Sequence, residues 1–215
     1  SVERRQLLEL FGAKVHLSDG LRGTNGSIEV AERMAAADPR YLLLYQYGNP
    51  ANPQAHYETT GPEILRDMGD LPVDVFIAGL GTGGTLMGVG RYLKECHPTI
   101  RVIGVVPHPG DLVQGLRSLD EGFIPPILDE TVLDGKIVVS SRDSFIATRE
   151  LTRQEGIFAG ISAGAVIHCA RRIAHRRERG NIVVLLADGG WKYLSTNLWT
   201  QQAEEDEGID SKVWW

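Results

Sequence analysis

The stretch that decides the fold is Val73-Asp74-Val75-Phe76-Ile77-Ala78, which runs directly into Gly79-Leu80-Gly81-Thr82-Gly83-Gly84-Thr85. The first stretch has the composition of a short apolar strand, and residues 86–95 after the glycines have a helical pattern. Glycines let the backbone turn sharply and approach a ligand, while a helix start offers unpaired N–H groups and a partial positive charge. The stretch therefore predicts a strand–loop–helix unit that binds an anion, most often a phosphate.

Two nucleotide-binding motifs lack parts that they require. Gly79, Gly81 and Gly84 satisfy GxGxxG, but a dinucleotide-binding loop also needs a carboxylate about 20 residues further on. The next strand ends in Val106-Pro107-His108, without one. A mononucleotide loop would need Gly-Lys-Ser/Thr, and no lysine follows these glycines. Nucleotides are therefore disfavoured, and a tight turn that binds nothing remains the structural alternative.

The composition is that of an ordinary globular protein of 215 residues, with 42% hydrophobic residues. A net charge of −6 without a dense Lys/Arg stripe argues against nucleic acid as the main partner. The local arginine run at 171–179 is interpreted as the solvated face of a helix. Cys96 and Cys169 lack metal-ligand spacing and predict reduced thiols of a cytoplasmic protein without a metal site. No apolar stretch approaches the length of a membrane span, so no membrane partner is expected.

Helical and extended patterns alternate along the chain, which predicts an α/β fold of parallel strands covered on both faces by helices. The expected strands are residues 13–17, 41–45, 73–78, 101–106, 136–140 and 182–187. The expected helices are residues 3–11, 27–37, 58–68, 86–95, 144–155 and 162–177. The breaker-rich segment 47–53 predicts a domain crossing, and the irregular, proline-rich stretch 107–135 predicts a functional surface segment.

The chain resembles the fold-type II pyridoxal-phosphate enzymes, specifically the cysteine synthases. Motifs of that family occur in family order over nearly all 215 residues. They are Glu3-Arg4-Arg5, Gly12-Ala13, Gln46-Tyr47-Gly48-Asn49-Pro50-Ala51-Asn52, Thr60-Gly61-Pro62-Glu63-Ile64, Gly81-Thr82-Gly83-Gly84-Thr85, Glu121-Gly122-Phe123-Ile124-Pro125, Glu155-Gly156-Ile157-Phe158-Ala159-Gly160-Ile161-Ser162 and Tyr193-Leu194-Ser195-Thr196. The resemblance implies a fold like that of the tryptophan synthase β subunit. It implies an incomplete small domain at residues 1–48 and a large phosphate-binding domain at residues 49–215.

The resemblance implies pyridoxal 5'-phosphate as the cofactor and assigns residues to it. The cofactor phosphate is expected on the loop formed by Gly81, Thr82, Gly83, Gly84 and Thr85.

Two further residues match family positions. Ser162 matches the serine that hydrogen-bonds the pyridine nitrogen, and Gln46 matches the residue that binds the substrate carboxylate. Taken alone, Ser162 has the features of a helix N-cap and Gln46 those of a surface glutamine.

The family chemistry needs a Schiff-base lysine, which lies upstream of the region matched by Glu3-Arg4-Arg5. The lysines of this chain all lie in other sequence contexts, at Lys14, Lys94, Lys136, Lys192 and Lys212. We therefore expect the chain to lack roughly the first third of the enzyme, by comparison with two-domain α/β proteins, and not to catalyse by itself. The alternatives are a natural pseudo-enzyme and a catalytically silent binding paralogue.

Details of the resemblance point to the O-phosphoserine-dependent branch, which makes L-cysteine with sulfur from a small thiocarboxylated carrier protein. Residues 114–121 are longer than in the acetylserine-dependent enzymes and contain Arg117, which could pair with a leaving phosphate. The segment 188–193 resembles the same branch, and Trp214-Trp215 is compatible with a C-terminal lid. The alternatives are an acetylserine-dependent or cystathionine-forming enzyme, with Arg117 as a solvated loop arginine. The resemblance also implies a homodimer, and Val106 stands where the family usually has glutamate.

Overall fold

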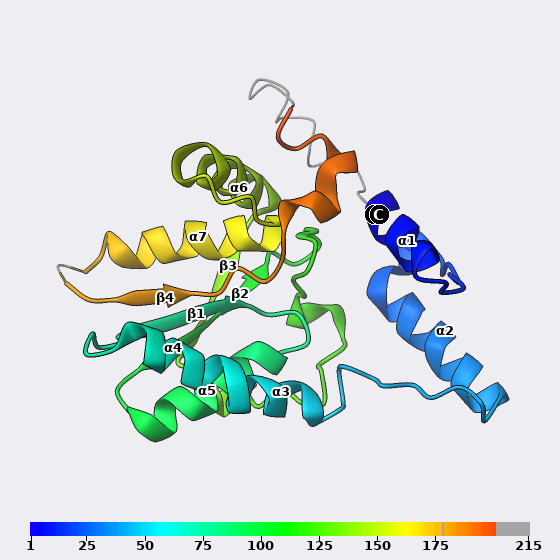
Figure 1. Cartoon of the computed structure of the whole chain (residues 1–215), viewed down its shortest axis with the longest axis horizontal. Helices are drawn as coiled ribbons and strands as arrows, with labels where there is room; N and C mark the ends of the chain where they lie inside the picture. Colours follow the sequence, from blue (N-terminus) through cyan, green and yellow to red (C-terminus); the bar gives the residue numbers. More distant parts are fainter. Residues whose placement is uncertain (178, 201–215) are drawn as a thin grey trace.

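A computed structural model describes residues 1–177 and 179–200. A four-stranded parallel sheet in the order β3-β2-β1-β4 forms its centre (Figure 1). The strands are β1 (Val75–Gly79), β2 (Arg101–Pro107), β3 (Gly135–Val139) and β4 (Ile182–Val184). The predicted parallel architecture is confirmed, and the decisive strand begins and ends close to its expected position.

Helices cover both faces of the sheet (Figure 1). One face carries α6 (Ser141–Glu155) and α7 (Ile161–Ala174), and the other carries α3 (Ala51–Ala55), α4 (Gly61–Met68) and α5 (Gly84–Cys96). Along β1, Val75 and Ile77 pack into the cluster under α7, whereas Phe76 and Ala78 pack into the cluster around α5. Both faces of β1 are buried, which is why its sequence is continuously apolar rather than alternating.

Two helices near the N-terminus, α1 (Val2–Leu10) and α2 (Gly23–Ala37), lie to one side of the sheet (Figure 1). Short helices complete the set: the π-helix His56–Thr60 and the 3-10 helices Gly20–Arg22, Leu119–Glu121, Glu130–Val132 and Gly190–Thr196. The 3-10 helix Gly190–Thr196 holds α1, because Arg4 Nη2 donates to Tyr193 Oη over 2.8 Å and the Glu3 carboxylate accepts from Ser195. The first and last family-like motifs are therefore in direct contact.

The two strands predicted in the first 48 residues are wrong. Segments 13–17 and 41–45 are irregular, and neither pairs with another segment of the described chain. Their aliphatic side chains are exposed, with Leu42 at 85% and Leu44 at 71%. A strand forms by hydrogen-bonding to a neighbour, so an apolar pattern without a neighbour leaves an extended, exposed segment.

Smaller differences concern the ends of elements. The breaker-rich segment 47–53 already contains the start of α3 at Ala51. The helix expected over residues 58–68 begins as a π-helix at His56 and becomes α4 at Gly61. The strand expected over 182–187 ends at Val184. Element boundaries depend on capping contacts that local patterns encode weakly.

No helix of the described residues is long and apolar enough to cross a membrane. Within the same residues no group of His, Cys, Asp or Glu side chains has the arrangement of a metal site. Cys96 and Cys169 are both free thiols. Cys169 is buried, and this burial raises the pKa of its thiol to about 11, so the thiol stays protonated near neutral pH.

We expect Gly88→Ala to destabilise the fold, because α5 packs tightly on the segment that begins with α3. A Cβ at residue 88 would lie 2.2 Å from the Pro53 carbonyl oxygen and 2.6 Å from His56 Cβ. Neither atom can move without shifting the backbone, so the free energy of unfolding should fall by about 1–3 kcal/mol. Urea unfolding measures it. Gly104→Ala is the matched control, since its Cβ would meet nothing closer than 3.4 Å. Equal losses in both variants would contradict this account.

Candidate cofactor site

The glycine loop follows the carboxyl end of β1, where ligands bind in open parallel sheets. Leu80 N donates to Val105 O over 2.8 Å, which fixes the entry to the loop against β2. Gly83 then adopts φ +90°, a left-handed conformation that glycine reaches without steric cost, and α5 begins at Gly84. The turn from strand to helix is therefore completed within four residues.

Several loop amides are left without partners. Within the described residues, the backbone N–H groups of Gly81, Thr82, Gly83 and Thr85 make no hydrogen bond. Thr82 Oγ1 accepts from Gly84 N over 3.2 Å and from Asn52 Nδ2 over 3.0 Å, so its own hydroxyl proton remains available to donate. Unpaired amides at a helix start, with a hydroxyl beside them, form a binding site for an anion.

Two residues that sequence reasoning did not assign to the site support this loop. The Asn52 amide reaches both Thr82 and the Gln46 carbonyl oxygen, and a Cβ on Gly84 would lie 2.0 Å from Asn52 Oδ1. His56 bridges Thr60 Oγ1 at 3.0 Å and Thr85 Oγ1 at 3.2 Å. Asn52 belongs to a family-like motif, whereas a single histidine in a polar segment gives no comparable signal.

A cavity of about 340 Å³ opens beside the loop. Gly81, Gly115 and Arg117 line it together with the start of α2 and the segment 107–118. No lysine of the described chain is among the residues that line this cavity. The irregular stretch 107–135 therefore does contribute a wall to a ligand-sized cavity, at the end of the sheet that carries the glycine loop.

Arg117 is buried, so its interpretation as a solvated loop arginine is wrong. Only 6% of the residue is exposed, and Arg117 Nη1 donates to Asn25 Oδ1 over 2.9 Å. Its guanidinium carbon lies 4.7 Å from the centroid of the Phe123 ring and 5.1 Å from that of the Tyr47 ring. A cation packed against two aromatic rings that contact each other, at the wall of a cavity, is held in a fixed orientation.

Ser162 is not a helix N-cap. The helix α7 begins at Ile161, and Gly160 occupies the cap position. Ser162 is 6% exposed, and its hydroxyl has no hydrogen-bond partner among the described residues. It lies against Gly115, because a Cβ on that glycine would be 3.3 Å from Ser162 Oγ. Gly115 lines the cavity, which brings the serine close to it, although Ser162 itself is not a lining residue.

Gln46 lies beside a neighbouring hollow rather than in the main cavity. That hollow, of about 360 Å³, shares Thr24 and Tyr47 with the main cavity. Val106, at the position where the family usually has glutamate, is buried in the apolar cluster around α5. Trp214 and Trp215, proposed as a lid from the sequence, lie outside the described residues.

The segment 188–193 also contacts the start of α7. Gly160 N donates to Asp188 O over 2.9 Å, and Tyr193 Oη donates to Asp188 Oδ2 over 2.8 Å. Burial, followed by the charge of Asp188, raises the pKa of Tyr193 to about 12, so the phenol remains protonated. Asp188 Oδ1 is buried without a partner in the described chain, next to Gly160.

These residues fit pyridoxal phosphate. The unpaired amides of Gly81, Thr82, Gly83 and Thr85 suit its phosphate dianion, and the unpaired Ser162 hydroxyl suits a ring nitrogen. The fit extends to the surroundings, because the cavity that begins at the loop has a volume within the range of small-molecule sites.

Comparisons with known proteins support pyridoxal phosphate as the cofactor. Residues 1–188 match the model of the family described as "Pyridoxal-phosphate dependent enzyme". A cysteine synthase of Aquifex aeolicus (strain VF5) is 42% identical over 208 residues, which cover 94% of this chain and 63% of that protein. Cysteine synthase A of Escherichia coli (strain K12) is 41% identical over 225 residues, which cover 96% of this chain and 69% of the relative.

Solved structures of related enzymes also match this chain. O-ureido-L-serine synthase matches with a TM-score of 0.85 at 36% identity, over 97% of this chain and 69% of that one. An O-acetyl serine sulfhydrylase, isoform 3 from Entamoeba histolytica, matches with a TM-score of 0.82 at 32% identity, over 98% of this chain and 66% of that one. The fold and site define a pyridoxal-phosphate enzyme of fold type II. The chain belongs to this family and, within it, to the cysteine synthases, and it spans 63–69% of the length of these curated relatives.

We expect His56 to be neutral at neutral pH. Burial lowers the pKa of His56 from its ordinary value of about 6.5. A folded-state pKa below the unfolded one means that its contribution to stability is present above about pH 6.5 and is lost as the pH falls. NMR titration of the His56 ring should give a midpoint below 6.5. His56→Gln, which cannot titrate, should make the free energy of unfolding less pH-dependent between about pH 7 and pH 5. A midpoint above the ordinary value would contradict the assigned contacts.

Proposed function

We propose that the whole protein makes L-cysteine by a pyridoxal-phosphate dependent β-replacement, in which sulfur replaces the leaving group of an activated serine. The observation that carries this proposal is the set of unpaired amides in a loop whose Gly81 lines a cavity, in a chain of the cysteine synthase family. Unpaired amides at a helix start can bind many different anions, and membership of this family indicates which one is bound, namely the cofactor phosphate. Family membership likewise supports a small amino acid as the substrate.

The chain's own residues bind and orient the cofactor. The amides from Gly81 to Thr85, with the Thr82 and Thr85 hydroxyls, bind its phosphate, while Asn52 and His56 hold these two hydroxyls in place. Ser162 donates to the ring nitrogen. When bound, the cofactor supplies an electron sink for the α-carbon of the substrate. A serine hydroxyl does not hold a proton on that nitrogen, which gives a moderate sink and suffices for loss of a β-leaving group.

We propose that the proton-transfer base is a lysine. It would lie in the region of the relatives that this chain does not cover. Three lysines of the described chain are already in ion pairs, namely Lys94 with Asp134, Lys136 with Glu130 and Lys192 with Asp188. Because none of the described lysines lines the cavity, the chain alone should bind the cofactor without turning over substrate.

We propose O-phosphoserine as the activated serine, with Arg117 as the residue that recognises its phosphate. Arg117 uses one terminal nitrogen for Asn25, which leaves further N–H donors of its guanidinium for an anion. Burial against two aromatic rings strengthens a pair with a phosphate, because little water competes for either charge. Gln46 is proposed to bind the substrate carboxylate, from the hollow that shares Tyr47 with the main cavity.

The remaining assignments come from the resemblance. They are a thiocarboxylated carrier protein as sulfur donor, a homodimer, and a division into a small domain at 1–48 and a large domain at 49–215. A second candidate is an enzyme that uses O-acetylserine, which the similarity to the Entamoeba histolytica enzyme favours. A third is a silent binding paralogue, which would bind partners through the same fold without chemistry.

Arg117→Ala should change the choice of substrate in the complete, cofactor-loaded protein. Loss of a charged hydrogen bond of about 1.5–3 kcal/mol should lower kcat/KM for O-phosphoserine by about 10–100-fold, relative to kcat/KM for O-acetylserine. Steady-state kinetics with both substrates measures this ratio, which does not depend on the fraction of protein that is folded.

Arg22→Ala is the matched control, because Arg22 lines the same cavity but is exposed and paired with Glu29. It should leave the ratio nearly unchanged. An unchanged ratio in Arg117→Ala would support the acetylserine enzyme. Cofactor binding without turnover of either ester would support the silent paralogue.

A further inference from the structure

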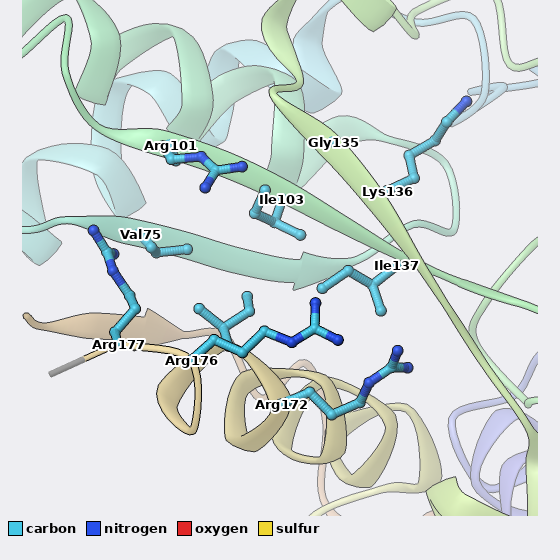
Figure 2. Close-up of a pocket in the computed structure, with 10 residues that line it drawn as sticks. Val75, Arg101, Ile103, Gly135, Lys136, Ile137, Arg172, Arg176 and Arg177 are labelled. Carbon is cyan, nitrogen blue, oxygen red and sulfur yellow. The ribbon is translucent and has the colours of Figure 1, made fainter.

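A second cavity, of about 360 Å³, lies at the opposite end of the sheet from the glycine loop. Its lining includes Val75, Arg101 and Gly135, which are the first residues of β1, β2 and β3. The glycine loop follows the last residue of β1, and the strands are parallel, so the two cavities are on opposite edges of one sheet. Figure 2 shows this hollow between the strands and the end of α7.

The cavity concentrates positive charge in a chain whose net charge is −6. Its five basic residues come from different elements: Arg101 from β2, Lys136 from β3, and Arg172, Arg176 and Arg177 from the end of α7 and the residues after it. In Figure 2 the side chain of Arg176 lies across the hollow, Arg101 reaches toward Ile103, and Lys136 points away.

Nearby carboxylates neutralise only part of this charge. Asp74 Oδ1 lies 3.9 Å from Arg177 Nη2, and Glu130 pairs with Lys136. Arg101 acts on Asp134 only through longer-range charge, since that carboxylate is held by Lys94.

The three remaining guanidinium groups are thus available to a ligand. Arg172 Nη1 has one weak contact, 3.5 Å from Val138 O. Within the described residues, the guanidinium groups of Arg101 and Arg176 make no hydrogen bond or close ion pair, although both backbone amides are bonded. Three cations at one hollow, with no matching carboxylate among residues 1–177 and 179–200, attract an anion.

The floor of the cavity is apolar. Ile137 and Ile173 are partly buried and give the floor its accessible apolar surface, with the buried Val75 and Ile103 packed beneath them. A simple inorganic ion would leave this surface in contact with water, whereas a ligand with an apolar body would cover it. The floor therefore selects an organic anion over a bare ion.

The simpler interpretation is that these arginines lie on the solvated face of α7. There their positive charges would interact favourably with the negative, C-terminal end of the helix dipole. It accounts for Arg171, which is on the same helix but pairs with Glu150 away from the cavity. It does not account for Arg101, which comes from β2 and shares the same hollow with Arg172 and Arg176.

We propose that this cavity is a second ligand site, which binds a small organic anion. Arg101, Arg172 and Arg176 hold a phosphate, sulfonate or carboxylate head group, and the apolar body of the ligand rests on Ile137 and Ile173. The site is separate from the cofactor site but shares a helix with it, because α7 carries Ser162 in its first turn and Arg172 in its last. This proposal does not depend on which serine ester the enzyme uses.

The test uses 1-naphthalenesulfonate as the probe and 1-naphthalenemethanol as its neutral counterpart, with the complete protein loaded with its cofactor. Isothermal titration should show that the sulfonate binds at least 10-fold more tightly than the alcohol. Arg176→Ala and Arg101→Ala should each weaken sulfonate binding about 10-fold. Arg171→Ala, on the same helix but paired with Glu150, should have no effect. NMR signals of the Ile103 and Ile137 methyl groups should shift on binding.

Any one of the following results would overturn the proposal. The sulfonate could fail to bind, or it could bind no more tightly than the alcohol. Arg171→Ala could also weaken sulfonate binding as much as Arg176→Ala does. Arg176→Lys guards against misfolding, because it keeps the charge and should retain more binding than the alanine variant at an unchanged melting temperature. Arg117→Ala, at the other end of the sheet, should leave sulfonate binding unchanged. A loss of binding there would place the probe in the cofactor cavity and also overturn the proposal.

Discussion

The backbone amides between β1 and α5 impose the constraint on which the candidate site depends. A strand that turns into a helix within four residues leaves several of its N–H groups without a hydrogen-bond partner in the described chain. Side chains must stay away for a ligand to reach them. At Gly84 the space that a Cβ would take is filled by Asn52, and at Gly81 it is filled by the Gly115 carbonyl oxygen, 2.8 Å away. The glycines thus keep the walls of the site close together without covering the amides.

The parallel sheet extends this arrangement to the rest of the site. All four strands run in one direction, so the starts of α5 and α7 and the segment after β2 converge on the same edge. These segments come together at Gly115, which lies next to both Gly81 and Ser162 and lines the cavity. The opposite edge receives the end of α7 and the starts of the strands, which places the basic cavity there.

The sequence could predict those features that are encoded within one segment. The strand at 75–79, its glycine loop and the helix α5 were predictable because a buried strand, tight glycines and a helical repeat are local patterns. The state of segments 13–17 and 41–45 could not be predicted in this way. A strand needs a neighbouring strand to pair with, and the apolar pattern of one segment does not show whether such a neighbour exists. The burial of Arg117 was hidden for the same reason. Its pocket is built by Asn25, Tyr47 and Phe123, which are distant in the chain.

The contact between the two ends of the described chain has a consequence for the cofactor site. Arg4 donates to Tyr193, Tyr193 donates to Asp188, and the Asp188 carbonyl oxygen accepts from Gly160 at the start of α7. Ser162 is two residues further on, in the first turn of that helix. A displacement of α1 therefore acts, through three hydrogen bonds, on the turn that positions the Ser162 hydroxyl. Tyr193 is buried and the Asp188 side chain is only 12% exposed, so water competes little for the bond between them, whereas Arg4 at the outer end is 37% exposed. The inner part of this connection is therefore better protected from water than its contact with α1.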